Sequence, residues 1–88
     1  MASYSLRIKK SAIKELETIP SRADRQRIVK RIRALADDPR PRGVQKLSGK
    51  ERYRVRQGRY RILYSILDRE LIVYIVRVAD RKLVYRNH

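Results

Sequence analysis

The 88-residue sequence contains no cysteine and a single histidine, and both features narrow its chemistry. Without cysteine the chain can form neither disulfides nor thiolate metal sites. The one histidine, His88, is the last residue, and a frayed terminal residue is a poor general base. The 9 acidic residues form no spaced carboxylate cluster that would hold Mg²⁺. We therefore expect neither a metal site nor a cofactor.

Long apolar stretches are also missing. No window approaches the roughly 18 apolar residues that a membrane span needs. The first residues, MASYSLRIKK, lack the apolar core of a signal peptide. These features predict a cytoplasmic protein with no membrane partner. At this length we expect residues 1–88 to form a single domain.

Basic residues dominate the composition. The chain has 24 basic against 9 acidic residues, a formal charge of +15, and 17 of the basic residues are arginine. Guanidinium groups bind phosphate with two parallel hydrogen bonds and stack on aromatic rings. So large an excess of one charge indicates an anionic partner, which could be nucleic acid, an acidic protein or an anionic membrane surface.

The first half of the chain reads as one strand and two helices. Residues Tyr4 to Ile8 alternate as a strand does, and a helical pattern runs from Ser11 until Pro20 closes it. Ser21 is then typical of an N-cap, with Asp24 at the capping-box position. The second helix has an apolar stripe at Ile28, Ile32 and Leu35.

Most basic residues of the second helix lie off its apolar stripe. This is typical of a solvated helix face. Docking of a partner helix, or an extension of an RNA footprint, is the alternative. The residues concerned are Arg22, Arg25, Lys30, Arg31 and Arg33.

The second half predicts three strands after a proline-containing linker at residues 37–43. The strands are expected at residues 51–56, 59–67 and 71–78. Residues 71–75 are almost continuously apolar, which suits a central strand covered on both faces by the two helices. We therefore predict an α+β fold, in the order β-α-α-β-β-β, with a small antiparallel-rich sheet covered by the two helices.

The stretch RYRVRQGRYRILY, residues 52–64, has five arginines on an apparent β-hairpin. A turn at Gln57 and Gly58 would put Arg56 opposite Arg59. Alternation would then gather Arg54, Arg56, Arg59 and Arg61 on one face. The core face would hold Tyr53, Val55, Tyr60 and Ile62. Because only Glu51 offers a nearby acid, we predict that the arginines bind phosphate rather than form a solvated face.

The last stretch, RVADRKLVYRNH, adds further basic residues around a tyrosine. Tyr85 could stack on an unpaired base, serve in proton transfer, or pack as a core or rim aromatic residue. The basic residues are Arg77, Arg81, Lys82 and Arg86.

The segments KLSGKERYRVRQGRYRILY and VRVADRKLVYR, with the order of elements, resemble the RelE/ParE superfamily of prokaryotic toxins, most closely its RelE branch. The resemblance implies a metal-independent endoribonuclease that cuts messenger RNA in the ribosomal A site. The catalytic residues that it implies are Arg54, Arg56, Arg61, Arg81 and Tyr85. Further RNA contacts are expected from Lys50, Arg52, Arg59, Arg77, Lys82 and Arg86.

The chain departs from this family at two places. The first-strand pair, often lysine in the family, is Arg54 and Arg56 here, and a permanently protonated arginine is a poor general base. Asp80 stands where relatives often carry a histidine or lysine, so a carboxylate lies close to Arg81. Phosphate binding is therefore a more natural role for these arginines than proton transfer.

The resemblance also implies partners. These are a cognate antitoxin, messenger RNA on the ribosome beside the 16S rRNA surface, and a higher-order toxin–antitoxin complex on operator DNA. Two other functions stay open, namely a ParE-like inhibitor of DNA gyrase and a non-catalytic module that binds RNA or the ribosome.

Overall fold

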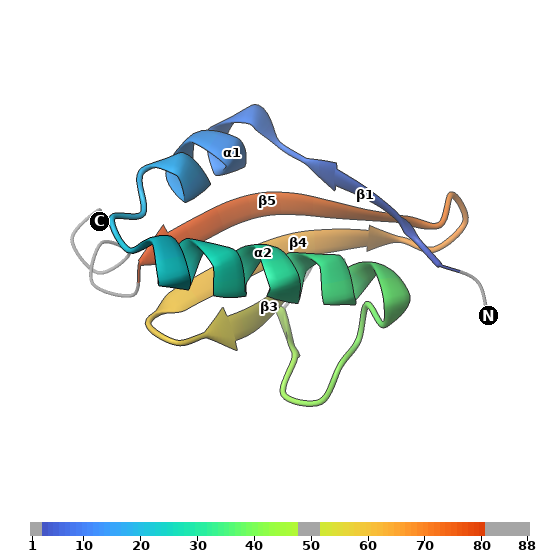
Figure 1. The fold of residues 1–88 in the computed structure, drawn as a ribbon. Helices are drawn as coiled ribbons and strands as arrows, with labels where there is room; N and C mark the ends of the chain where they lie inside the picture. Colours follow the sequence, from blue (N-terminus) through green and yellow to red (C-terminus); the bar gives the residue numbers. More distant parts are fainter. Residues whose placement is uncertain (1–2, 48–51, 81–88) are drawn as a thin grey trace.

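The structure, a computed structural model, describes residues 3–47 and 52–80 (Figure 1). It confirms the α+β class and every predicted element, and it adds a short strand before the hairpin. In chain order the elements are β1 (Ser5–Ile8), α1 (Lys10–Glu17), α2 (Arg22–Asp37), β2 (Gln45–Leu47), β3 (Arg52–Gln57), β4 (Tyr60–Leu67) and β5 (Ile72–Asp80).

The strands form one mixed sheet in the order β1-β5-β4-β3-β2. β1 runs parallel to β5, and all other neighbours are antiparallel. Both helices lie between β1 and β2 in the sequence, so the chain crosses from one edge of the sheet to the other through them. The β3–β4 hairpin is therefore left at the side of the sheet away from β1, next to α2 (Figure 1).

One face of the sheet packs against both helices. Tyr64, Ile62 and Ile75 are fully buried there, together with Ile28 of α2 and Ala12 of α1. The prediction that helices cover both faces of the last strand was wrong. Burial alternates from Ile72 to Val76, and the other face of this part of the strand is only half-buried at Ile72 and Tyr74. The strand is inner because β1 and β4 flank it, and this flanking accounts for its apolar composition.

α2 begins at the predicted N-cap. The Asp24 amide donates a hydrogen bond to Ser21 Oγ at 3.2 Å, which satisfies one free amide of the first turn. The Asp24 carboxylate forms an ion pair with Arg27 at 3.6 Å. Within the described residues, no helix is long and apolar enough to cross a membrane.

A buried tyrosine fixes the linker that follows α2. The Tyr64 hydroxyl donates a 2.7 Å hydrogen bond to the Pro39 carbonyl, and the Tyr64 ring stacks on Tyr53 at 5.8 Å between centroids. Burial raises the pKa of Tyr64 to about 12, so the hydroxyl stays protonated at neutral pH. This contact holds the linker against the sheet just before β2 begins.

Candidate nucleic-acid interface

The hairpin turn differs from the predicted one by one residue. Gly58 and Arg59 form the turn, and Gly58 has a φ of 60°, which glycine adopts without a steric cost. A glycine at the first central position is typical of a type II′ hairpin turn. In the resulting register Arg56 lies opposite Arg61 and Val55 opposite Ile62. The predicted register, with Arg56 opposite Arg59, was therefore wrong.

The corrected register still gathers arginines on one face. Arg56 and Arg61 are directly opposite each other, and Arg54 precedes Arg56 by two residues, so its side chain lies on the same face of the sheet. Their neighbours Val55 and Ile62 point to the other side, into the core beneath the helices. We call four arginines of β3 and β4 that lie together on the sheet face away from the helices the arginine face; they are Arg52, Arg54, Arg56 and Arg61.

Burial differs among these arginines. Arg61 is only 8 % exposed, and Arg52 and Arg54 are half-buried, whereas Arg56 is exposed. Directly opposite like charges cost roughly 0.2–1 kcal/mol per cross-strand pair. The Arg56–Arg61 pair thus places two positive side chains where folding alone would favour opposite charges. An anionic ligand at this place would turn the repulsion into attraction.

A glutamine contacts Arg54 of this face. Gln45 of β2 lies opposite Arg54, and its Oε1 accepts a hydrogen bond from the Arg54 guanidinium. Sequence analysis missed Gln45 because the strand that positions it was not predicted. Within the described part of the chain, neither Arg54 nor Arg56 forms an ion pair with an acidic side chain.

Arg59 does not belong to the arginine face. Its place in the turn lets its guanidinium donate two hydrogen bonds to Asp80 Oδ2, at 3.0 Å from Nε and 2.7 Å from Nη2. This contact raises the pKa of Arg59 above its usual value. The guanidinium also lies 5.9 Å from the centre of the Tyr60 ring. Arg59 therefore ties the hairpin turn to the end of β5, and its charge is compensated.

Arg77 is compensated in a similar way. Its Nε lies 3.2 Å from Glu15 Oε2, and Glu15 Oε1 also accepts a 2.9 Å hydrogen bond from the Val78 amide. β1 pairs with β5 only as far as Ile75, so Glu15 satisfies a backbone donor on the β5 edge beyond β1. Arg77, which was predicted to contact RNA, is thus paired with Glu15 within the protein.

Several predicted site residues lie outside the described residues. They are Lys50, Arg81, Lys82, Tyr85 and Arg86, and the roles expected of them stay predictions. In residues 3–47 and 52–80, no three histidine, cysteine, aspartate or glutamate side chains gather in a group that could hold a metal ion.

One further arginine lies near the arginine face. Arg31 of α2 lines a hollow of about 330 Å³ together with Arg54 and Arg56. Sequence analysis grouped Arg31 with the solvated residues of its helix. It precedes the buried Ile32 and follows Ile28 by three residues, so it lies at the border of the apolar stripe. That position was the available signal that Arg31 points toward the sheet.

Comparison with known proteins gives consistent matches. Residues 6–85 match the family model described as the ParE toxin of the type II toxin–antitoxin system parDE. The candidate toxin RelE1 from Methanocaldococcus jannaschii is 27 % identical over 88 residues, covering 96 % of this chain and 97 % of the relative.

Two solved toxin–antitoxin complexes contain a chain of the same fold. In the archaeal RelE–RelB complex from Pyrococcus horikoshii, the matched chain is 30 % identical with a TM-score of 0.80, over 90 % of this chain and 96 % of that one. In the RelBE2 complex from Mycobacterium tuberculosis, the matched chain is 29 % identical with a TM-score of 0.77, and the match covers 90 % of this chain and 99 % of that one.

Proposed function

Since this chain belongs to the ParE toxin family of type II toxin–antitoxin systems, within the RelE/ParE superfamily, we propose that it acts by cutting messenger RNA on the ribosome. The observation that supports this activity best is the arginine face. It groups Arg54, Arg56 and Arg61 on the sheet face away from the helices, with Arg56 exposed, Arg54 half-buried and Arg61 buried. In the proposal this face holds the scissile phosphate in the ribosomal A site.

The chemistry suited to these side chains needs no metal. The 2′-hydroxyl of a nucleotide attacks its own 3′-phosphate, and the bond from phosphorus to the 5′-oxygen of the next nucleotide breaks. The 2′-hydroxyl loses its proton, and the leaving 5′-oxygen gains one. The products are a 2′,3′-cyclic phosphate and a 5′-hydroxyl. The arginines would align the attack and stabilise the extra negative charge of the phosphorane.

The arginines contribute charge rather than base catalysis in this proposal. A guanidinium stays protonated at any physiological pH, so Arg54 and Arg56 cannot accept the proton of the 2′-hydroxyl. Positioning of the RNA on the ribosome would therefore account for more of the rate than proton transfer by the arginine face. The sequence-based assignment of Arg81 to the leaving group and of Tyr85 to base stacking or proton transfer completes the proposal.

Brief expression of the toxin followed by primer extension on cellular messages tests this function. The wild type should produce cuts at fixed codon positions in messages that are being translated. Arg56→Ala should reduce the cleavage rate by about 10²–10³, because one preorganised charged donor is commonly worth that much.

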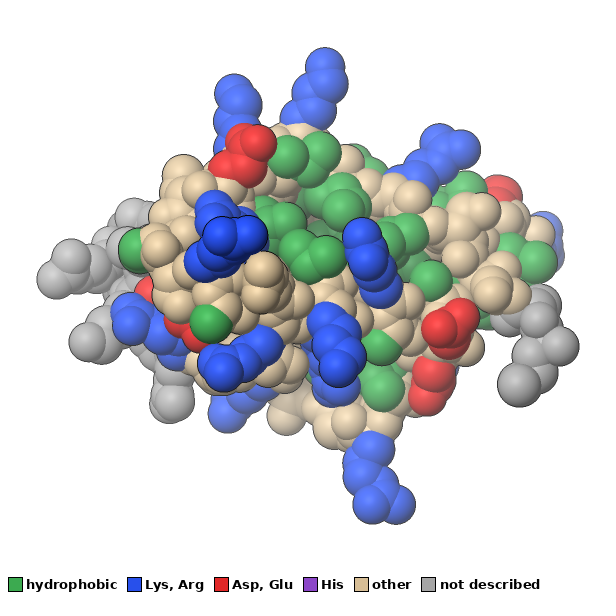
Figure 2. All heavy atoms as spheres, in the orientation of Figure 1, with side chains coloured by type: hydrophobic (Ala, Val, Ile, Leu, Met, Phe, Trp, Pro, Cys, Tyr) green, Lys and Arg blue, Asp and Glu red, His purple; other side chains and the backbone are tan. Residues whose placement is uncertain are grey.

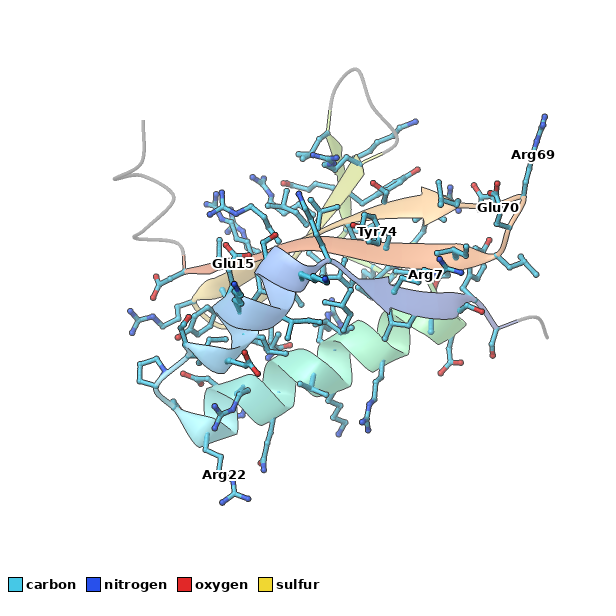
Figure 3. All side chains as sticks on the ribbon, turned by 90° about the horizontal axis from the view of Figure 1, so that it is seen from above. Arg7, Glu15, Arg22, Arg69, Glu70 and Tyr74 are labelled. Atoms are coloured by element: carbon cyan, nitrogen blue, oxygen red, sulfur yellow. The ribbon has the colours of Figure 1, made fainter. Side chains whose placement is uncertain are left out.

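Arg22→Ala is the matched control for this experiment. Arg22 is an exposed arginine at the start of α2, and it points away from the sheet (Figure 3). The control removes the same charge and should cleave as the wild type does. Full cleavage by Arg56→Ala, or equal loss in both variants, would contradict the assignment.

A second candidate function is inhibition of DNA gyrase. The match of residues 6–85 to the ParE family model favours it. Gyrase-trapped DNA breaks without cuts in messenger RNA would support this candidate and overturn the first. If neither DNA breaks nor cuts in messenger RNA are found, the remaining function is binding of RNA or the ribosome without catalysis.

The partner that we propose in either case is a cognate antitoxin. The matched structures from P. horikoshii and M. tuberculosis are complexes of a toxin with its antitoxin. An antitoxin with an acidic or amphipathic segment would neutralise the arginine face by covering it. Assembly of such a complex on operator DNA stays part of the proposal.

A further inference from the structure

The edge of β3 next to α2 is only partly covered by another strand. β2 pairs with residues 52–54 of β3, so residues 55–57 have no strand partner on that side among the described residues. Two hollows lie along this uncovered edge. The first, of about 330 Å³, is lined by Arg31, Gly43, Gln45, Arg54, Val55 and Arg56. The second, of about 250 Å³, is lined by Arg27, Lys30, Arg31, Ala34 and Gln57.

Arg31 lines both hollows, so they are adjacent, and the two together, between α2 and the β3 edge, are here called the edge groove. Arg54 and Arg56 line this groove and also belong to the arginine face. The groove therefore continues from the open face of the sheet, around the edge of β3, to α2. Figure 2 shows lysine and arginine side chains at several points along α2.

The edge groove is strongly basic. Five of its lining side chains carry a positive charge, and only Arg27 forms an ion pair with a described acid, Asp24, at 3.6 Å. None of the described residues that line the two hollows is acidic. Positive charges that share a hollow raise the local potential and attract an anion. The basic side chains are Arg27, Lys30, Arg31, Arg54 and Arg56.

Arg31 is packed more deeply than the exposed arginines of α2, such as Arg27 and Arg33. The residue is half-buried, and its Nε is fully buried without a hydrogen-bond partner in the described structure. Its charge acts on the Tyr64 hydroxyl, where it partly opposes the rise in the pKa of Tyr64 caused by burial. A side chain already restricted in this way loses less conformational freedom when it binds a ligand.

We propose that the edge groove binds the phosphate backbone of single-stranded RNA, with Arg31 as its central ligand. The inference rests on the proposed function, because it extends the path of the RNA from the arginine face to α2. Two observations favour RNA over an acidic peptide. Among the described residues that line the groove, only Val55 and Ala34 have wholly apolar side chains, and the guanidinium fork matches a phosphate.

Binding of a short RNA at several salt concentrations tests this inference. The probe is a single-stranded RNA of about ten nucleotides, made uncleavable by 2′-O-methyl groups, and fluorescence anisotropy reports its binding. Each phosphate contact contributes about 0.7 to the log–log salt slope on single strands. Arg31→Gln should therefore lower the slope by about 0.7, and at about 0.1 M salt should weaken binding about fivefold.

Arg22→Gln serves as the matched control, because it removes the same charge from the same helix. Arg22 lines neither hollow. Its slope and affinity should stay close to those of the wild type.

The outcomes separate this inference from the proposed function. An Arg31→Gln variant that binds RNA as Arg22→Gln does would overturn the inference, as would a loss of antitoxin binding with unchanged RNA binding. A clear Arg31 effect on RNA binding, combined with a wild type that cuts no message, would support the groove and overturn the nuclease. A wild type that does not bind the RNA at all would overturn the inference and leave the nuclease to be judged by the cleavage of messages on the ribosome.

Discussion

Replacing Arg56 with glutamate should stabilise the folded protein, whereas the same change at Arg59 should destabilise it. The two residues are separated by only two positions in the sequence, but their partners differ. Arg56 lies opposite Arg61 in the hairpin, and Arg59 forms an ion pair with Asp80 at 2.7 Å. Arg56→Glu would thus exchange a like-charge pair for an opposite-charge pair. Arg59→Glu would bring a second carboxylate to Asp80.

The size of the stabilisation follows from the cross-strand geometry. A like-charge pair costs, and an opposite-charge pair contributes, roughly 0.2–1 kcal/mol each, so Arg56→Glu should add about 0.5–2 kcal/mol. In a domain of this size 1 kcal/mol shifts the Tm by about 4–8 °C. Both variants change the net charge of the protein equally, so any effect of global self-repulsion cancels between them.

Thermal unfolding followed by circular dichroism measures the difference. We expect a higher Tm for Arg56→Glu and a lower Tm for Arg59→Glu than for the wild type. At 1 M salt, where the Debye length is about 3 Å, the difference should shrink. Equal shifts of the two variants in the same direction would refute the register argued above. Arg56→Glu should also lose messenger RNA cleavage, which would show that the like-charge pair serves function at the expense of stability.

Two further predictions concern the loop between β4 and β5. Leu71 has a φ of 54°, a conformation that costs most L-residues roughly 1–2 kcal/mol but suits asparagine. Leu71→Asn should therefore raise the free energy of unfolding in urea by up to about 1 kcal/mol. Leu67→Asn is the control, because Leu67 is 42 % exposed and Leu71 is 40 % exposed, and this change should not stabilise the protein. Arg40 and Tyr4 donate hydrogen bonds to Asp68 and lower the pKa of its carboxyl group. Because the pKa of Asp68 is lower in the folded than in the unfolded protein, its charge stabilises the fold above the unfolded pKa, and this stabilisation is lost as the pH falls. Below about pH 4 the free energy of unfolding of the wild type should therefore fall more steeply with pH than that of Asp68→Asn. Equal dependence on pH in the two proteins would contradict this.

The fold was predictable where local signals and burial agree. The N-cap at Ser21 and the alternation of the hairpin each place one set of side chains in the core, and the structure confirms both. β2 escaped prediction because it has three residues and no apolar alternation. Its existence depends on pairing with β3 rather than on its own sequence.

The register of the hairpin could have been read from the sequence. Gly58 can be the second residue of a turn at Gln57 and Gly58 or the first residue of a turn at Gly58 and Arg59. The two turns differ by two residues in the β4 residue that lies opposite each β3 residue. The structure takes the second choice, with Gly58 at a positive φ. A shift of two residues keeps every side chain on its face, which is why Arg54, Arg56 and Arg61 were grouped correctly by an incorrect register. Arg59 was the residue misplaced by the error.

The partners of individual arginines could not be predicted, because they depend on contacts between residues far apart in the chain. Glu15 reaches Arg77 across 62 positions, and nothing in the spacing of α1 indicates this contact. The same holds for Arg31, whose helical pattern places it at a border but does not say which strand lies beneath. Tertiary structure therefore decides which of the many positive charges are compensated and which are available to a ligand.

The acidic residues are few, and their positions explain how so basic a chain can fold and still bind an anion. In the described structure three ion pairs join elements distant in sequence, at the ends or edges of the sheet. They tie the linker after α2 to the β4–β5 turn, the hairpin turn to β5, and α1 to β5. The pairs are Arg40–Asp68, Arg59–Asp80 and Arg77–Glu15.

Among the described residues, no acidic side chain lines the edge groove, and none of these three pairs includes Arg54 or Arg56. The acids thus neutralise positive charge where the chain must be held together and leave it where a phosphate could bind. Removing a paired arginine such as Arg59 should therefore affect mainly stability, whereas removing Arg56 should affect mainly RNA. Total charge does not distinguish the two classes of arginine, and only their placement in the fold does.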